Sequence, residues 1–263
     1  MMDYTHILYE VNDGVATVTI NRPKQLNAFD GTTITELTDA FHRIEEDKDV
    51  GVAVLTGAGE RSFSAGGDVN WEAEGGLEGR KGEDQIKAFY AAIRSCYKPT
   101  IARINGYAIG GGHHMAYMCD LSIAADHAIF GQNGPRVASP AQGWLVSYLI
   151  DVIGAKRARE FWLLCRRYTA EQALDFGLVN AVVPMDQLDA EVRKWCDEIL
   201  ALSPSVIKIV KASFDNHFDD VRTRQDEIDF LQRINPSFWQ SGEQKEGTEA
   251  FLNKRTPDFS PWR

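Results

Sequence analysis

The chain has 263 residues, of which 44% are hydrophobic and 25% are charged, and its formal net charge at pH 7 is -10. A chain of this length and composition forms one large globular domain, or a core with a small appended piece, and needs no disulfide or metal for stability. The acidic balance argues against a surface for nucleic acid or an anionic membrane, although a local basic patch can still bind an anionic ligand.

The chain begins without the signature of a targeting signal. Its first ten residues carry acidic groups where a signal peptide needs basic ones, and no apolar run approaches the roughly 18 residues of a membrane span. The four cysteines are far apart and lack the spacing of metal ligands. We therefore expect a soluble, cytoplasmic protein without a metal site.

Predicted strands and helices alternate in the first half. Residues 14–20 alternate apolar and polar side chains, which indicates a half-buried strand, and residues 50–57 form an apolar run that predicts a strand covered on both faces. Residues 32–47 have apolar side chains at helical spacing, with Thr32 or Thr33 as the candidate cap. The recurring order of strands and helices predicts a layered or spiralled α/β core.

Helices dominate the chain from about Gln142 onward. Before that point, residues 71–83 (WEAEGGLEGRKGE) are rich in glycine and charge and have no apolar period. We expect this segment to be a solvent-exposed loop and a candidate lid, with Glu72, Glu74 and Glu78 in solvent.

Two glycine-rich segments have the composition of a ligand site. They are residues 62–69 (SFSAGGDV) and residues 106–114 (GYAIGGGHH). Glycines at the end of a strand leave backbone N–H groups accessible, and two converging donors would form an oxyanion hole; two tight turns are the alternative. Neither segment matches a nucleotide-binding pattern, and the chain lacks the GxSxG elbow of serine hydrolases.

Two histidines follow the second glycine segment. If a helix begins near Gly111, His113 and His114 lie in its first turn, where the positive helix end keeps an imidazole neutral. That environment suits a general base. Hydrogen bonds to nearby carbonyls are the alternative role for both side chains.

Taken together, these segments resemble the crotonase (enoyl-CoA hydratase/isomerase) superfamily over nearly the whole chain. The resemblance rests on FSAGGDV, NGYAIGGGHHMAYMCDLSIAADHAIFGQ, GAKRAREFWLLCRRYTAEQALDFGLVNAVVP and EGTEAFLNKRTPDF. Within the superfamily, IFGQNGPRV, REFWLLCRRY and KRTPDF are similar to 1,4-dihydroxy-2-naphthoyl-CoA synthases and 2-ketocyclohexanecarboxyl-CoA hydrolases. The resemblance implies an α/β fold with a ββα-spiral core over residues 1–200. It also implies a helical region over residues 201–263 that assembles the chain into a trimer or a dimer of trimers.

The resemblance further implies an acyl-CoA substrate and no tightly bound cofactor. The thioester oxygen would be held by the N–H groups of Gly67 and Gly111. Coenzyme A would be bound by a set that includes Asp68, which we also expect to cap the next turn, and two residues of a neighbouring subunit, Phe251 and Lys254. The other members of that set are Arg22, Lys24, Leu26, Ala28, Ser64 and Ala65.

The sequence departs from the hydratase pattern at the two positions that carry catalytic glutamates. These positions hold His114 and Gly134. In the naphthoyl-CoA synthases a glycine at the second position leaves room for a bicarbonate, and the matching pocket here would be Gln132, Gly134 and Trp162. Ser139 is shared with that branch and could hydrogen-bond to substrate or water, or pack.

The synthase pattern is also incomplete. Ala141 stands where the synthases have an aspartate, Trp144 where they have an aromatic residue, and Trp239 where they have a tyrosine. Loss of the aspartate and of the tyrosine argues against synthesis of a naphthoate ring. The tryptophans Trp71, Trp144, Trp162 and Trp239 suggest a bulky or alicyclic acyl group.

We therefore expect hydrolytic C–C cleavage of a cyclic β-oxoacyl-CoA through an enolate, with His114 activating water and His113 in a structural role. Hydration of an enoyl-CoA and a cyclase of the naphthoyl-CoA synthase kind are the narrower alternatives. A protein that binds acyl-CoA without catalysis is the alternative from another class, since three expected carboxylates are missing.

Overall fold

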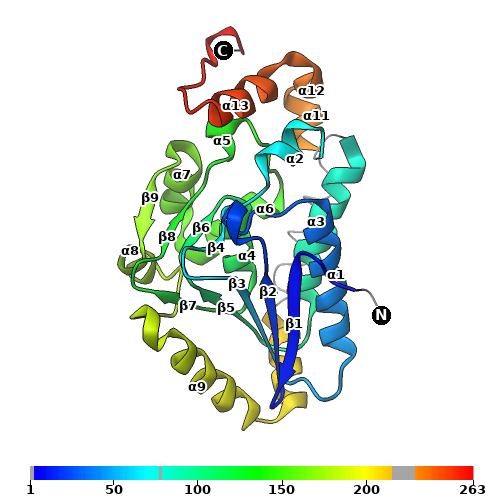
Figure 1. The fold of residues 1–263 in the computed structure, drawn as a ribbon, viewed down its shortest axis with the longest axis vertical. Helices are drawn as coiled ribbons and strands as arrows, with labels where there is room; N and C mark the ends of the chain where they lie inside the picture. Colours follow the sequence, from blue (N-terminus) through cyan, green and yellow to red (C-terminus); the bar gives the residue numbers. More distant parts are fainter. Residues whose placement is uncertain (1–2, 77–78, 215–228, 263) are drawn as a thin grey trace.

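The computed structural model describes residues 3–76, 79–214 and 229–262, and it contains two β-sheets surrounded by helices (Figure 1). The larger sheet has the strand order β1-β2-β3-β5-β7-β10 and is parallel except for the β1–β2 hairpin. Its strands are β1 (Ile7–Asn12), β2 (Val15–Ile20), β3 (Val52–Gly57), β5 (Thr100–Ile104), β7 (Leu121–Ala125) and β10 (Ala181–Val183). The smaller sheet has the order β4-β6-β8-β9, with β4 (Ser62–Ser64), β6 (Tyr107–Ile109), β8 (Ile129–Gly131) and β9 (Arg167–Thr169).

Three consecutive β-β-α units build this pair of sheets. In each unit the first strand joins the larger sheet, the second joins the smaller sheet, and a helix follows. The helices are α2 (Val69–Ala73), α4 (Gly111–Met118) and α5 (Gly134–Val137). The predicted ββα spiral is therefore confirmed. The apolar run of residues 50–57 forms β3, in which every residue is buried, as predicted.

The first long helix, α1 (Gly31–Glu46), begins one residue earlier than predicted and has a different cap. The side chain of Asp30 accepts a hydrogen bond from the N–H of Thr33 at 2.9 Å, and the Thr33 side chain completes a capping box. The predicted cap at Thr32 or Thr33 is wrong, because Thr33 occupies the third helical position. Helix α1 lies beside α3 (Gly79–Ser95) and packs on β1 and β2 (Figure 1).

The prediction of an exposed loop over residues 71–83 is wrong at both ends, because residues 71–73 belong to α2 and residues 79–83 belong to α3. Asp68 caps α2 through a hydrogen bond from the N–H of Asn70, and this helix carries Glu72 into the interior. Glu74 is exposed, as expected, whereas Glu78 lies outside the described residues. The short helix escaped prediction because its five residues have no apolar period.

Helices form most of the second half. They are α6 (Trp144–Ile153), α7 (Ala155–Leu164), α8 (Ala170–Asp175), α9 (Leu188–Leu200), α11 (Phe230–Ile234), α12 (Phe238–Ser241) and α13 (Glu243–Leu252), and residues 204–214 are also helical. Helix α13 returns to the core and packs on α2 and α5, next to the C-terminus in Figure 1. Oligomerisation through residues 201–263 stays a prediction. In the described ranges, none of the helices is both long enough and apolar enough to span a membrane.

Candidate active site

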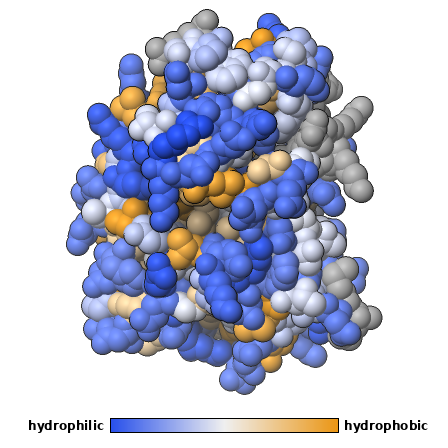
Figure 2. Space-filling model, turned by 45° about the horizontal axis from the view of Figure 1, so that its top comes forward, coloured by the Kyte–Doolittle hydropathy of each residue, from blue (hydrophilic) through white to orange (hydrophobic). Residues whose placement is uncertain are grey.

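The smaller sheet determines where the candidate site lies. Strands β4, β6 and β8 are parallel neighbours, and each is followed at its carboxyl end by one of the predicted site segments. A cavity of about 460 Å³ lies at this edge, lined by the starts of α2, α4 and α5 and by the end of α13. Carboxyl ends of parallel strands commonly form such binding crevices. Figure 2 shows apolar surface gathered in a hollow that hydrophilic side chains surround.

Gly67 and Gly111 both line this cavity. Backbone hydrogen bonds from Phe29 to Gly66 and from Asp68 to Phe29, both 2.8 Å, hold the first segment and leave the Gly67 N–H unpaired. Gly111 is the first residue of α4, so its N–H has no partner within the helix. Neither N–H donates to any of the described residues, which makes both available to a ligand oxygen.

The two glycine segments touch at a position that excludes a side chain. Gly66 has φ of +94°, and a Cβ there would lie 3.0 Å from the Gly111 nitrogen and 2.8 Å from the Ile109 oxygen. Glycine is therefore required for the segments to approach each other this closely. The structure thus brings Gly67 and Gly111 together, as the sequence predicted.

A buried carboxyl group lies directly beside the first donor. Glu72 is 5% exposed and lines the cavity, and a Cβ added to Gly67 would overlap its Oε1 atom. Burial raises the pKa of Glu72 to about 7, with the Asp68 charge adding to the rise and the Ser139 hydroxyl opposing it. A carboxyl group with this pKa can both accept and donate a proton near neutral pH.

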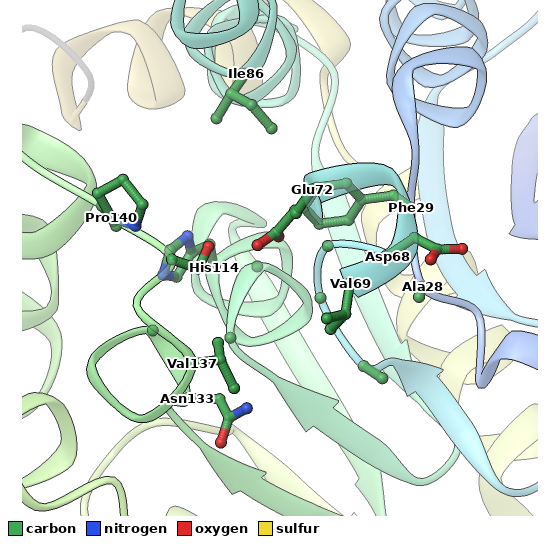
Figure 3. Close-up of a pocket in the computed structure, with 18 of the residues that line it drawn as sticks. Ala28, Phe29, Asp68, Val69, Glu72, Ile86, His114, Asn133, Val137 and Pro140 are labelled. Carbon is green, nitrogen blue, oxygen red and sulfur yellow. The ribbon is translucent and has the colours of Figure 1, made fainter. Parts of the chain in front are cut away.

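His114 occupies the opposite wall. Figure 3 shows the Glu72 carboxyl group and the His114 ring facing one another across the cavity. His114 is 5% exposed and packs against Trp162 and Tyr90, with ring centroids 5.4 and 5.6 Å apart. Burial lowers its pKa to about 4, which the Gln132 side chain only partly offsets, so the imidazole is neutral at pH 7.

Comparison with known proteins agrees with this geometry. The model of the enoyl-CoA hydratase/isomerase family matches residues 10–261. The chain belongs to this family. Its α/β architecture is accordingly the crotonase fold, and the protein is an acyl-CoA enzyme of the hydratase/isomerase kind.

Three solved structures illustrate the similarity. Carnitinyl-CoA hydratase from Mycobacterium avium is 30% identical, with a TM-score of 0.85 and coverage of 97% of this chain and 98% of that one. An enoyl-CoA hydratase/isomerase from Xanthobacter autotrophicus Py2 is 28% identical, with a TM-score of 0.83 and coverage of 96% and 98%. A monofunctional enoyl-CoA isomerase from M. smegmatis is 32% identical, with a TM-score of 0.70 and coverage of 81% and 94%.

Most of the residues that the family resemblance assigned to coenzyme A lie at the cavity. Lys24, Leu26, Ala28, Ala65 and Asp68 line it. Ser64 does not: it is fully buried, and its hydroxyl accepts a hydrogen bond from the Gly66 N–H at 3.2 Å. This hydrogen bond helps to hold the glycine segment in place.

The assignment of Arg22 to the coenzyme A site stays a prediction. Its guanidinium lies between Asp30 and Asp68, at 3.0 and 2.9 Å from their carboxylate oxygens, and donates to the Ala28 carbonyl. Arg22 is outside the cavity lining. It links the cap of α1 to the cap of α2 and so fixes the start of the helix that carries Glu72.

The two C-terminal residues predicted to bind coenzyme A, Phe251 and Lys254, differ in their positions relative to the cavity. Phe251 lines the cavity of its own chain, because α13 folds back over α2 and α5. The supply of Phe251 by a neighbouring subunit stays a prediction. Lys254 is exposed beyond the end of α13 and does not line the cavity.

The four tryptophans also divide into two groups. Trp162 and Trp239 line the cavity. Trp144 does not, because it is the first residue of α6 and packs into the core, and its neighbour Leu145 takes the place at the wall. Trp71 lies against Gly31 and Gly76 outside the cavity. The aromatic pocket is thus smaller than the sequence suggested.

The remaining predicted positions, Gln132, Gly134 and Ser139, line the cavity, as does Ala141. His113 lies behind it, stacked on Phe161, with its Nδ1 at 3.0 Å from the Gln132 amide nitrogen. Burial keeps the pKa of His113 well below its usual value, which fits the structural role expected for it.

Sequence reasoning missed Glu72 and Tyr90. Tyr90 comes from α3, lines the cavity, and donates a hydrogen bond to the Gly111 carbonyl at 3.1 Å. One signal for Glu72 was available: Asp68 is a good cap, and a carboxyl group four residues later lies one turn into the helix that such a cap starts.

Proposed function

We propose that the protein moves protons at the carbon next to an acyl-CoA thioester, with Glu72 as the acid–base group. The N–H groups of Gly67 and Gly111 would hold the oxygen of the enolate. The observation that carries this proposal is the buried Glu72 carboxyl group, which lies against Gly67 inside the cavity. A carboxyl group so placed is beside the thioester rather than at the far end of the acyl group.

Glu72 suits this work better than His114, the residue favoured from the sequence. The pKa of Glu72 is raised to about 7, so both of its protonation states are populated near neutral pH. The pKa of His114 is lowered to about 4, so its imidazole holds a removed proton poorly. Burial makes the carboxyl group a stronger base and the imidazole a weaker one.

Our preferred reaction is hydrolytic cleavage of a cyclic β-oxoacyl-CoA. The Glu72 carboxylate takes a proton from water, and the water oxygen bonds to the β-carbonyl carbon. The Cα–Cβ bond then breaks, and its electron pair forms the thioester enolate at Gly67 and Gly111. Protonated Glu72 returns the proton to Cα, so one water is consumed and the ring opens to a carboxylic acid, which releases its remaining proton to solvent. The apolar walls of Ile86, Val137 and Pro140 support an alicyclic acyl group (Figure 3).

Hydration of an enoyl-CoA is the second candidate. Glu72 would then activate the water that adds to Cβ and deliver a proton to Cα, in place of the two glutamates of ordinary hydratases. The similarity to carnitinyl-CoA hydratase supports this candidate. A naphthoyl-CoA synthase-like cyclase has less support, because Ala141 supplies no carboxyl group. A catalytically silent acyl-CoA-binding protein would have no use for a buried acid at this point.

The experiment is mass spectrometry of CoA thioesters incubated with the protein and with a Glu72→Gln variant. The panel holds 2-oxocyclohexanecarboxyl-CoA, crotonyl-CoA, a cyclic enoyl-CoA and o-succinylbenzoyl-CoA. Gain of one water on the ketone, lost in the variant, supports ring hydrolysis. Water added only to an enoyl-CoA selects hydration. Turnover that Glu72→Gln leaves unchanged would remove Glu72 from the mechanism.

A further inference from the structure

One wall of the cavity carries polar atoms that the described residues leave without partners. They are Nε2 of His114, Oε1 of Gln132 and Nε1 of Trp162. All three side chains are more than nine-tenths buried, with exposed fractions of 5%, 0% and 8%. A buried polar atom without a partner costs about 1–3 kcal/mol, so three at one wall indicate a site that a ligand completes.

The three side chains converge and are held in place. The His114 and Trp162 rings lie 5.4 Å apart between centroids. The Gln132 side chain lies within hydrogen-bonding reach of the His114 ring and raises the His114 pKa, which opposes the effect of burial. The amide nitrogen of Gln132 donates to His113 at 3.0 Å, which fixes the free Oε1 atom on the other side of the amide. The wall is therefore preorganised before any ligand binds.

The charges around this wall favour a neutral ligand group over an anion. His114 is uncharged at pH 7, and the acidic Glu72 faces it across the cavity (Figure 3). The nearby guanidinium of Arg167 is turned away, because it donates to the backbone oxygen of Gln132 at 2.8 Å and to Asn133 at 3.1 Å. An anion here would meet a carboxyl group and no free cation among the residues described at this wall.

We propose that His114, Gln132 and Trp162 form a second oxygen site, which binds a neutral carbonyl oxygen in the acyl group beyond the thioester. The Trp162 indole N–H can only donate, and the neutral His114 ring donates from Nε2 in one of its two tautomers. Both would bond to the ketone oxygen. Oε1 of Gln132 can only accept, and would take the O–H of the water that attacks the ketone. This inference rests on the proposed function and narrows its substrate class to oxo-acyl-CoA thioesters.

The test compares two thioesters that differ in one oxygen, cyclohexanecarboxyl-CoA and 2-oxocyclohexanecarboxyl-CoA. Calorimetry in a Glu72→Gln background, where turnover is suppressed, gives both dissociation constants. We expect the oxo-thioester to bind about tenfold tighter, the value of one or two additional hydrogen bonds. Adding Trp162→Phe should abolish this preference, which is read as the ratio of the two dissociation constants.

Trp144→Phe is the matched control. The Trp144 indole nitrogen is also buried and without a partner in the described part of the chain, but Trp144 does not line the cavity. This variant should keep the preference. His114→Phe gives a second variant if Trp162→Phe fails to fold, and it should weaken the preference too, because it removes the other donor to the ketone oxygen.

Three results would overturn the proposal. The first is equal affinity for the two thioesters, and the second is a preference that survives Trp162→Phe. The third is binding of sodium bicarbonate alone that Trp162→Phe abolishes, which would assign the wall to an anion. Turnover of the oxo-thioester by the unsubstituted protein reports separately on the proposed reaction, so the two proposals can fail independently.

Discussion

Helices α2 and α4 begin close to Gly67 and Gly111, and each buries one ionisable side chain whose pKa shifts in the opposite direction from the other. Helix α2 carries a carboxyl group and α4 carries an imidazole, and both side chains are buried against one cavity. Burial penalises the charged form of each. It raises the pKa of Glu72 to about 7 and lowers that of His114 to about 4. The same desolvation moves the pKa of the carboxyl group towards neutral pH and moves the pKa of the imidazole away from neutral pH.

The largest expected effect is the loss of kcat when Glu72 is substituted, compared with the loss when His114 is substituted. Glu72→Gln keeps the side-chain shape and removes the acid, so kcat should fall by about 10²–10⁴-fold, as for loss of a general acid–base group. His114→Gln should cost much less, about tenfold on an oxo-thioester. Steady-state rates on the active thioester measure both. Glu74→Gln, on an exposed residue two positions away, is the control and should be silent.

Equal losses in Glu72→Gln and His114→Gln would erase the distinction between the two helices. A larger loss in His114→Gln would reverse it and restore the imidazole as the base.

The next largest effect is expected from substitution of Gly67, the glycine beside Glu72. Gly67→Ala places a Cβ on the Glu72 Oε1 atom and must displace the carboxyl group from its position. We expect kcat to fall by about 10²–10³-fold, comparable to the loss of one oxyanion donor. Gly59→Ala is a useful control, because a Cβ there has open space, although its φ of +77° carries backbone strain. Circular dichroism on both variants separates misfolding from displacement of Glu72.

The pH dependence of kcat/KM should identify which group titrates. If Glu72 must lose its proton to act, kcat/KM rises by about two orders of magnitude from pH 5 to pH 8, with an apparent pKa about 7. A base with the pKa of His114 would give a profile that is already flat above about pH 5. The profile of Glu72→Gln should be flat as well as low.

The smallest expected effect is on stability. Between pH 4.5 and about 7 the folded protein keeps the Glu72 proton while the unfolded chain has lost it, so stability falls as pH rises through this window. Relative to Glu72→Gln, the unsubstituted protein should lose about 2–3 kcal/mol of unfolding free energy between pH 5 and pH 8. The contribution of His114 has the opposite trend, because its lowered pKa makes stability rise with pH from about 4 to 6.5. This contribution is present in both proteins and therefore cancels in the comparison.

Denaturant unfolding at several pH values measures this difference. A constant difference between the two proteins across the range would mean that the pKa of Glu72 is near its ordinary value.

The parts of the site that the sequence predicted are those that depend on local chain geometry. Gly67 and Gly111 end adjacent parallel strands, so their approach follows from strand order and from residues that accept close backbone contact. The buried run of β3 was equally predictable from its uninterrupted apolar residues. Each of these inferences needed only a few consecutive residues.

The parts of the site that the sequence did not predict depend on contacts between distant segments of the chain. Glu72 is buried at a cavity that α13 helps to line, and the Gln244 amide of that helix donates to the Glu72 backbone oxygen at 3.1 Å, across 172 residues of chain. The placement of Trp162 at the wall and Trp144 in the core depends in the same way on how α6 and α7 pack. Composition alone cannot distinguish such residues.

The most direct test of the central claim is the titration of Glu72 itself. Carbon-13 NMR of protein labelled at the glutamate carboxyl carbons, recorded against the Glu72→Gln variant, isolates the resonance of this one group. We expect a single carboxyl signal that titrates at about pH 7 and is missing from the variant. A Glu72 signal that titrates near 4.5, its ordinary value, would contradict the account and leave the cavity without an acid–base group poised at neutral pH.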